Sequence, residues 1–339
     1  VGSLVGAAVA RNIRVMVGIW ACCVLSIVGN LVFAVGGVVG VLAVGRVFAG
    51  LGFGLAAVFV PAYARAVGGV RMVGLFGAGL TLGVAAALFL GSVLEGADVS
   101  WRVAFLITAA LAAVALPILP NERVEIPRTT SEGGGLAREA LTNQAWWRVQ
   151  LLGLTTLTIP LVVGAWLVHF LITGYGMSAG AAGALAFALF GISAVMRDVA
   201  GRMTASGDSP SMLVIVGLAL GAGGLFLLGV GDSTLAAVVS LVLMAVGLSL
   251  PYPLYYDEAE RVLPDRPIGS LGLMQVGTGI FPIPVIPAFG AALASGDADL
   301  AFAGLAAFTL LTLVVNARPP VRPREPGVPE VSATSADPG

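Results

Sequence analysis

The chain contains no lysine, and charged side chains of every kind are scarce. Charged residues make up 10% of its 339 residues, and all of the basic ones except the single His169 are arginines. A soluble domain carries about 25% charged residues because its surface faces water, so an ordinary soluble fold is excluded. The formal net charge of −1 gives no electrostatic reason to expect nucleic-acid binding.

Cysteine is rare as well, and the two that are present, Cys22 and Cys23, are adjacent in one apolar segment. Neighbouring cysteines make a poor disulfide and an incomplete metal site. No histidine cluster marks an enzyme site either, and the acidic cluster at 257–260 is interpreted as a solvated helix end. We therefore expect no enzyme, no metal centre and no cofactor.

Long apolar runs take the place of the missing charge. Hydrophobic residues make up 58% of the chain, and runs of more than about 18 apolar residues can each cross a bilayer core of about 30 Å as a helix. The runs predict eleven helical segments, the first of them partial: 1–10, 15–36, 39–63, 72–94, 101–119, 149–172, 179–201, 210–230, 234–256, 268–293 and 299–316.

Arginine is distributed unevenly between the two ends of these segments. If the connection around Arg11 and Arg14 is cytoplasmic, every arginine in the other connections except Arg102 is also cytoplasmic, as the positive-inside rule requires. This predicts a multi-pass protein of the plasma membrane. The polar stretch 120–148 is then a cytoplasmic linker, and 318–339 is expected to be a disordered cytoplasmic tail.

The two halves of the chain repeat at an offset of 195 residues. The string 71–77 then falls on 266–272, and both read Arg-x-x-Gly-x-x-Gly. Parallel repeats of this kind predict an N-terminal bundle over 1–119 and a C-terminal bundle over 149–317. Because segment 149–172 has no partner in the first half, we expect a first helix to be missing from the sequence. A natural eleven-helix protein is the alternative.

Two loop motifs resemble the major facilitator superfamily. The family's loop between its second and third helices reads Gly-x-x-x-Asp-Arg-x-Gly-Arg-Arg. Residues 6–14 are similar, with Ala10 where the family has its aspartate. Residues 191–202 are similar to the equivalent loop entry in the second half. Because Ala10 carries no carboxylate, we do not expect that part of the family's cytoplasmic latch in the first half.

Two helix motifs extend the resemblance along the chain. Residues 46–52 match the family's Arg-x-x-x-Gly-x-Gly pattern, and 101–105 are similar to the entry of its sixth helix. The Gly-Pro signature of drug/proton antiporters is absent from 79–84. The resemblance implies an all-α membrane fold of two pseudo-repeated six-helix bundles, with eleven spans present here, and a transporter that works by alternating access.

Small residues and helix-end charges mark a predicted gate. Glycines four residues apart put a small surface on one helix face and let helices approach closely. The predicted pairs are Gly2 and Gly6, Gly50 and Gly54, and Gly79 and Gly83. Arg197 and Asp198 lie toward the cytoplasmic end of their helix and are interpreted as a gate pair. The predicted gate or conformational-motif residues are Gly2, Gly6, Arg11, Arg14, Arg197, Asp198, Gly201 and Arg202.

Polar side chains within the spans are candidates for a substrate cavity. Arg46 lies inside its span, either in the cavity or as a structural tie to the missing helix. His169 beside Trp166 is either functional or an interfacial anchor. Gln275 and Thr278 share a helix face and either line a cavity or join helices by hydrogen bonds. The cavity candidates are Arg46, Thr81, Trp166, His169, Tyr252, Tyr255, Gln275 and Thr278.

Together these features predict secondary transport of a small solute. The buried arginines favour an organic or inorganic anion, efflux of hydrophobic compounds is the alternative, and a polytopic membrane enzyme is a less favoured third reading. The expected partners are the small-molecule substrate, the lipid bilayer and a coupling proton or ion, although no carboxylate lies at the middle of a span.

Overall fold

The computed structural model describes residues 14–119, 135–206, 210–263 and 267–317, and all regular structure in these ranges is helical. The first elements are α2 (Val15–Val35), α3 (Val39–Gly96), α4 (Arg102–Ala115) and η1 (Leu116–Ile118). The later elements are α5 (Leu136–Thr142), α6 (Gln144–Gly153), η2 (Leu154–Thr158), α7 (Ile159–Tyr175), α8 (Ala179–Ala205), α9 (Pro210–Val230), α10 (Thr234–Gly247), α11 (Tyr252–Val262), α12 (Pro267–Ile280), α13 (Pro282–Ser295) and α14 (Ala298–Asn316).

Each full span predicted from the apolar runs corresponds to helix. Within the described residues, eight helical stretches are long and apolar enough to cross a membrane. One of them, α3, is two helices joined by non-helical backbone at Gly68 and Gly69, where Gly69 has φ +63°. The shorter helix Arg102–Ile118 accounts for the predicted span at 101–119. The partial segment 1–10 lies outside the described residues.

Proline explains where single spans divide into two helices. Pro251 and Pro253 fall at the junction of α10 and α11, and Pro282 begins α13. Proline lacks a backbone N–H and clashes with the preceding turn, so an α-helix ends or kinks there. Each of these two spans therefore crosses as a pair of shorter helices.

Part of the predicted linker 120–148 is helical. Helix α5 occupies Leu136–Thr142, and α6 begins at Gln144 rather than at the predicted boundary of 149. The side chain of Asn143 accepts hydrogen bonds from the backbone N–H groups of Ala145 and Trp146 at 2.9 and 3.4 Å. This N-cap starts the helix early. The remaining residues of the linker, 120–134, and the tail 318–339 lie outside the described residues.

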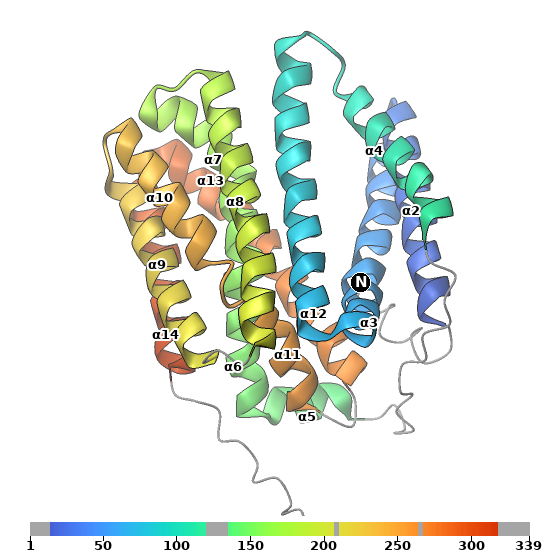
Figure 1. The fold of residues 1–339 in the computed structure, drawn as a ribbon. Coiled ribbons are helices and arrows are strands. Elements are labelled where there is room, and N and C mark those ends of the chain that lie inside the picture. Colours follow the sequence, from blue (N-terminus) through green and yellow to red (C-terminus); the bar gives the residue numbers. More distant parts are fainter. Residues whose placement is uncertain (1–13, 120–134, 207–209, 264–266, 318–339) are drawn as a thin grey trace, which may run out of the picture.

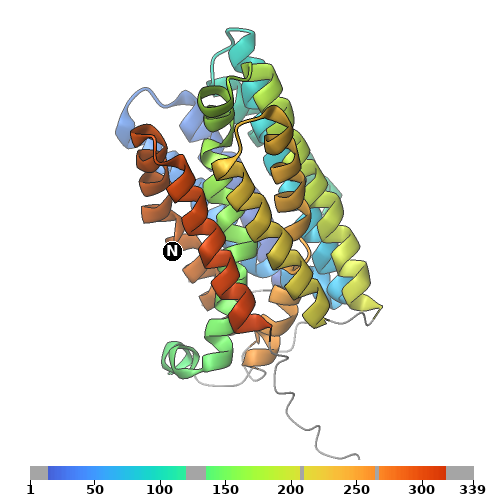
Figure 2. The same cartoon turned by 90° about the vertical axis from the view of Figure 1, so that its left-hand side faces the viewer.

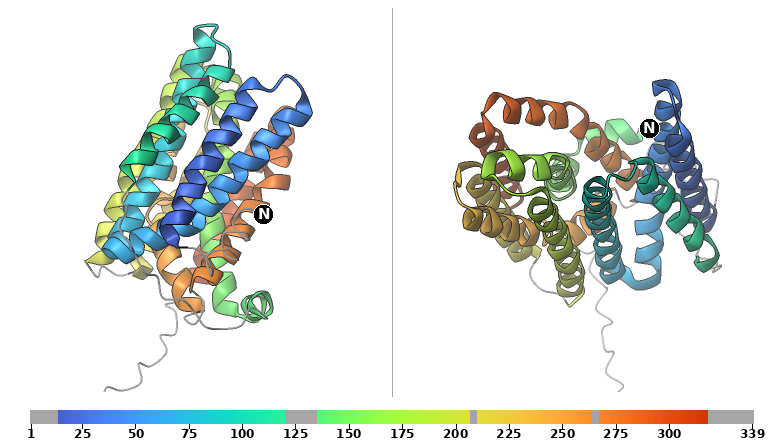
Figure 3. Two further views of the ribbon diagram at one scale, coloured as in Figure 1. Left: turned by 90° about the vertical axis from the view of Figure 1, so that its right-hand side faces the viewer. Right: turned by 90° about the horizontal axis from the view of Figure 1, so that it is seen from above.

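Two groups of helices lie side by side when the molecule is seen from above (Figure 3). One group contains α2, α3 and α4, and α2 packs against both of the others. In the second group α9 packs between α10 and α14 on the outer face (Figure 2). The second helix of α3 runs along α8, so these two elements form the main contact between the groups (Figure 1).

An ion pair marks the axis that relates the two repeats. Arg65 and Glu260 are equivalent at the offset of 195 (260 − 65), and Arg65 Nε lies 2.8 Å from Glu260 Oε2. Parallel repeats are related by an axis along the membrane normal. Equivalent positions of two such repeats can touch only near that axis. The contact therefore supports the internal repeat read from the sequence.

The glycines at the closest contact between α3 and α8 are not the predicted pair Gly79 and Gly83. A Cβ added at Gly79 or Gly83 would meet nothing within 4 Å, so the prediction for this pair is wrong. A Cβ at Gly74 would lie 2.7 Å from the backbone oxygen of Arg197 and 2.8 Å from Cα of Gly201. Spacing identifies a small helix face but not the faces that meet another helix. Here the meeting faces join α3 to α8.

Candidate functional site

The most deeply buried cation in the described residues is Arg197 on α8, with 5% of its surface exposed. Its Nη2 donates to the backbone oxygen of Thr156 at 3.1 Å, and its Nη1 makes a longer contact of 3.5 Å with that of Gly77. Its guanidinium also lies 4.1 Å from the ring centroid of Tyr252. Arg197 thus joins η2, α3 and α11.

Local backbone features make room for this arrangement. Thr156 belongs to the π-helical turn η2, where the regular hydrogen-bond ladder is interrupted and carbonyl groups become available to other donors. Gly77 has no side chain, and a Cβ there would collide with the ring of Tyr252. The carbonyl of Gly77 also accepts a hydrogen bond of 2.6 Å from the hydroxyl of Thr81. A π-turn and a glycine therefore shape the surroundings of the guanidinium.

The charge of Arg197 is incompletely compensated. Among the described residues, no carboxylate forms an ion pair with it, and its Nε has no hydrogen-bond partner. The side-chain amide of Gln150, which is 2% exposed, has both its oxygen and its nitrogen unpartnered, as is the hydroxyl of Tyr255. Buried polar groups normally have partners. Arg197, Gln150 and Tyr255 therefore keep unused hydrogen-bonding capacity.

A hydrogen-bonded chain extends from Tyr256 to α12. Gln275 Nε2 donates to the hydroxyl of Tyr256 at 2.9 Å, and its Oε1 accepts from Thr278 at 2.9 Å. The same amide nitrogen lies 3.4 Å from the backbone oxygen of Ala57 on α3. The ring of Tyr256 stacks with those of Tyr252 and Tyr255, with centroids 5.1 and 4.9 Å away.

The structure therefore gathers six of the predicted residues in one region. This region, which we call the Arg197 cluster, lies where α3 meets the second group of helices. Its predicted members are Thr81, Arg197, Tyr252, Tyr255, Gln275 and Thr278. Sequence reasoning missed Tyr256, which the packing of α11 against α12 brings into the cluster. It also missed Gln150, whose side-chain amide lies against Gly277 of α12.

Three cavity candidates lie elsewhere. Arg46 is exposed, and its guanidinium rests over the rings of Phe33 and Phe105 at 4.2 and 4.8 Å. Trp166 Nε1 donates to the backbone oxygen of Ile286 at 2.9 Å and so ties α7 to α13. The exposed His169 contacts the Trp166 ring edge-on, with centroids 6.2 Å apart.

The predicted gate residues separate into different environments. Arg197 and Asp198 do not pair with each other, because adjacent helix residues point about 100° apart. Asp198 instead pairs with Arg202 one turn later, at 2.6 Å. Gly201 packs against Gly74. Arg14 lies exposed at the start of α2, and Gly2, Gly6 and Arg11 lie outside the described residues.

An ion-pair network between the two groups of helices was not predicted. Arg65 on α3 pairs with Asp257 at 2.7 Å and with Glu260 at 2.8 Å, and Arg261 also pairs with Asp257 at 2.7 Å. The side chain of Asp257 is 5% exposed, so the prediction of a solvated helix end is wrong. The repeat offset, which places Arg65 opposite Glu260, is the signal that could have revealed it.

The fold is that of a multi-pass membrane protein, since eight helical stretches of the described residues are long and apolar enough to cross a bilayer. A family model described as the Major Facilitator Superfamily matches residues 1–271. The chain therefore belongs to the Major Facilitator Superfamily, a family of transporters. Both the predicted family and the predicted fold class are confirmed.

Solved transporter structures share the fold at low sequence identity. The E. coli fucose:proton symporter FucP is 15% identical, with 93% of this chain and 86% of that chain covered and a TM-score of 0.70. The proton:xylose symporter XylE is 14% identical, with 92% of this chain and 82% of that chain covered and a TM-score of 0.69. The human organic anion transporter MFSD10 is 16% identical, with 93% of this chain and 80% of that chain covered and a TM-score of 0.65. No curated protein matches the chain.

Proposed function

We propose that the chain is a secondary transporter that moves a small anionic solute across the plasma membrane by alternating access. The bundles 1–119 and 149–317, joined by the cytoplasmic linker 120–148, rock about the Arg197 cluster. The observation that carries the proposal is Arg197, a cation only 5% exposed that has no carboxylate partner among the described residues.

The cost of burying a charge explains why an anion fits. A cation inside a membrane protein is costly unless it is paired or hydrated. Two backbone carbonyl groups and the ring of Tyr252 compensate Arg197 only in part. A solute carboxylate or phosphate would complete the pairing, and guanidinium binds both with strong charge-assisted hydrogen bonds.

The position of Arg197 also links solute binding to the movement of the two bundles relative to each other. Its guanidinium contacts Gly77 in the N-terminal bundle and Thr156 in the C-terminal bundle. The contact with Gly77 is long, at 3.5 Å, and therefore weak. An anion that drew the guanidinium away from Gly77 would loosen one contact between the bundles. Binding would then favour their separation at this level.

The contacts between Gly74 and Gly201, and between Arg65 and Glu260, lie at the end that the arginine distribution makes cytoplasmic. We infer that the protein is closed on this side. FucP and XylE are proton symporters, so the proton is the coupling ion to test first.

Substrate-driven flux in proteoliposomes tests the proposal. The full-length protein would be given small carboxylates, inorganic phosphate, neutral sugars and lipophilic cations, each with and without a pH gradient. We expect uptake of an anion, and Arg197→Gln should weaken its apparent affinity about tenfold, the effect of losing one charge-assisted hydrogen bond. Arg46→Gln removes an equal charge outside the cluster and should leave the affinity unchanged.

Other outcomes would point to different functions. Movement of lipophilic cations that is insensitive to Arg197→Gln would favour efflux of hydrophobic compounds. Uptake of neutral sugars alone would contradict the anionic solute. Arg197→Lys keeps the charge but loses the planar fork, so it should bind the anion with intermediate affinity. Thermal unfolding of each variant shows whether a loss of flux reflects a loss of folding.

A further inference from the structure

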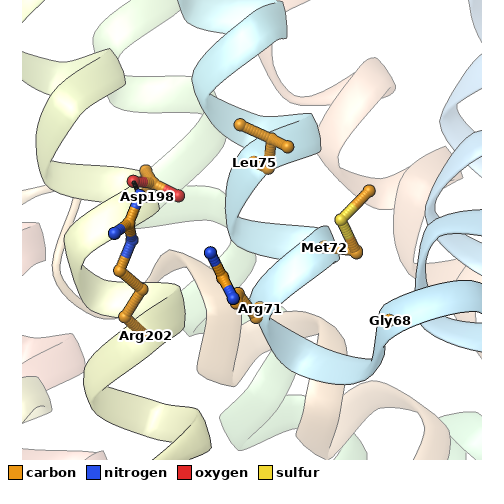
Figure 4. A pocket seen from close by; sticks show the side chains of 6 residues that line it. All are labelled: Gly68, Arg71, Met72, Leu75, Asp198 and Arg202. Carbon is orange, nitrogen blue, oxygen red and sulfur yellow. Dashed lines mark ion pairs between the residues drawn. The ribbon is translucent and has the colours of Figure 1, made fainter.

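A separate cavity of about 230 Å³ lies between α3 and α8. It is lined by Gly68, Arg71, Met72, Leu75, Asp198 and Arg202 (Figure 4). Three of these residues are charged and two have large apolar side chains. The cavity is therefore polar in one part and apolar in another, and each of the two bundles supplies part of its wall.

The charges of this cavity do not balance. Arg202 pairs with Asp198 at 2.6 Å, whereas Arg71 is exposed and forms no ion pair with any described residue. Two arginines against one aspartate leave one positive charge. The guanidinium of Arg202 is turned toward Asp198, whereas that of Arg71 points into the space between the two helices (Figure 4).

The cavity lies at the end of the membrane-spanning helices. Arg71 follows the turn at Gly68 and Gly69, and Arg202 lies in the last turn of α8. Both helix ends are at the same end of the molecule (Figure 1). Leu75 lies one turn further along α3 and is exposed. The arginines are thus placed at the depth of lipid headgroups, with apolar surface toward the bilayer core.

We propose that this cavity binds the phosphate group of an anionic phospholipid. Arginine pairs match the geometry of phosphate oxygens, and one excess positive charge balances a phosphodiester that carries no ammonium group of its own. Inorganic phosphate offers the same oxygens but no acyl chains. The apolar side chains of Met72 and Leu75 in the lining of the cavity favour the lipid as the source.

Lipid binding in this cavity would affect the transport cycle, an inference that rests on the proposed function. Arg71 lies on one bundle and Arg202 on the other, within one turn of the contact between Gly74 and Gly201. The two halves of the site stay together only while this contact is closed. A lipid bound across it would stabilise the state that is closed on the cytoplasmic side.

Lipid binding to the purified, delipidated protein tests the proposal directly. Native mass spectrometry and thermal unfolding would compare phosphatidylglycerol, phosphatidylcholine and inorganic phosphate. We expect phosphatidylglycerol to bind in preference and to raise the unfolding temperature. Arg71→Gln should weaken this binding about tenfold. Arg138→Gln removes an equal charge from exposed α5, outside the cavity, and should not weaken it.

Two results would overturn the proposal. Equal losses in Arg71→Gln and Arg138→Gln would show a general attraction to surface charge. Equal stabilisation by inorganic phosphate would exclude the lipid as the source. If Arg71→Gln does not fold, Arg71→Lys keeps the charge and should retain a weakened preference for phosphatidylglycerol. Because this assay measures no flux, binding can succeed while transport of an anion fails, and the two proposals are judged separately.

Discussion

The Gly74→Leu variant is expected to lose up to about 99% of transport while remaining folded. A Cβ at this position would already lie 2.7 Å from the backbone oxygen of Arg197 and 2.8 Å from Cα of Gly201. Backbone atoms cannot move aside as a flexible side chain can, so α3 and α8 must separate. A penalty of about 3 kcal/mol on the closed state alone would shift the equilibrium about a hundredfold toward the state open on the cytoplasmic side.

The same helix provides the control for this substitution. Gly79 meets nothing within 4 Å, so Gly79→Leu adds the same side chain without separating the bundles and should transport normally. Flux in proteoliposomes gives the rate, and the distance between spin labels on the turn at Gly68 and Gly69 of α3 and on the C-terminal end of α8 gives the conformation. An unchanged distance in Gly74→Leu would show that the glycine contact does not control closure.

Hydropathy predicts the helices well because the bilayer imposes a length and a composition on each span. The segments at 15–36 and 179–201 correspond to α2 and α8 with small changes at their ends. The sequence predicts that this helix ends at residue 201, because Arg202 and the residues beside it are typical of a loop. In the structure the helix continues to Ala205. Charged residues can lengthen a helix beyond the hydrocarbon core.

Pair contacts were harder to predict because they depend on which faces meet. Arg197 and Asp198 are neighbours in sequence, yet one points into the Arg197 cluster and the other toward Arg202. Arg65 and Asp257 are separated by 192 positions in the chain. Since a hydropathy profile treats each charge alone, it scores both as exposed. The predicted members of the Arg197 cluster were identified as polar residues in apolar spans, but their connection through Tyr256 required the fold.

Arg65→Gln is expected to open the side that we propose to be cytoplasmic, by removing the network around the repeat axis. Arg65 pairs with Asp257 and Glu260 across the bundles. Removing one partner of a fully buried pair costs about 3–5 kcal/mol, but the side chain of Arg65 is 26% exposed, so solvent screening reduces the cost to about 2 kcal/mol. Because the contact exists only between closed bundles, this cost falls on the closed state alone. It shifts the equilibrium between the closed and open states about thirtyfold toward the open state.

Two further variants distinguish whether Arg65 holds the two bundles together or only neutralises the charge of Asp257. Arg261 pairs with the same carboxylate from within α11 and is largely exposed, so Arg261→Gln should leave the label distance at the cytoplasmic ends almost unchanged. The double variant Arg65→Glu with Glu260→Arg exchanges the charges across the repeat axis and should restore closure in part, because the new arginine also lies within one helical turn of Asp257. Equal opening in Arg261→Gln, or no recovery in the double variant, would show that charge balance at Asp257 matters and that the contact between the bundles does not.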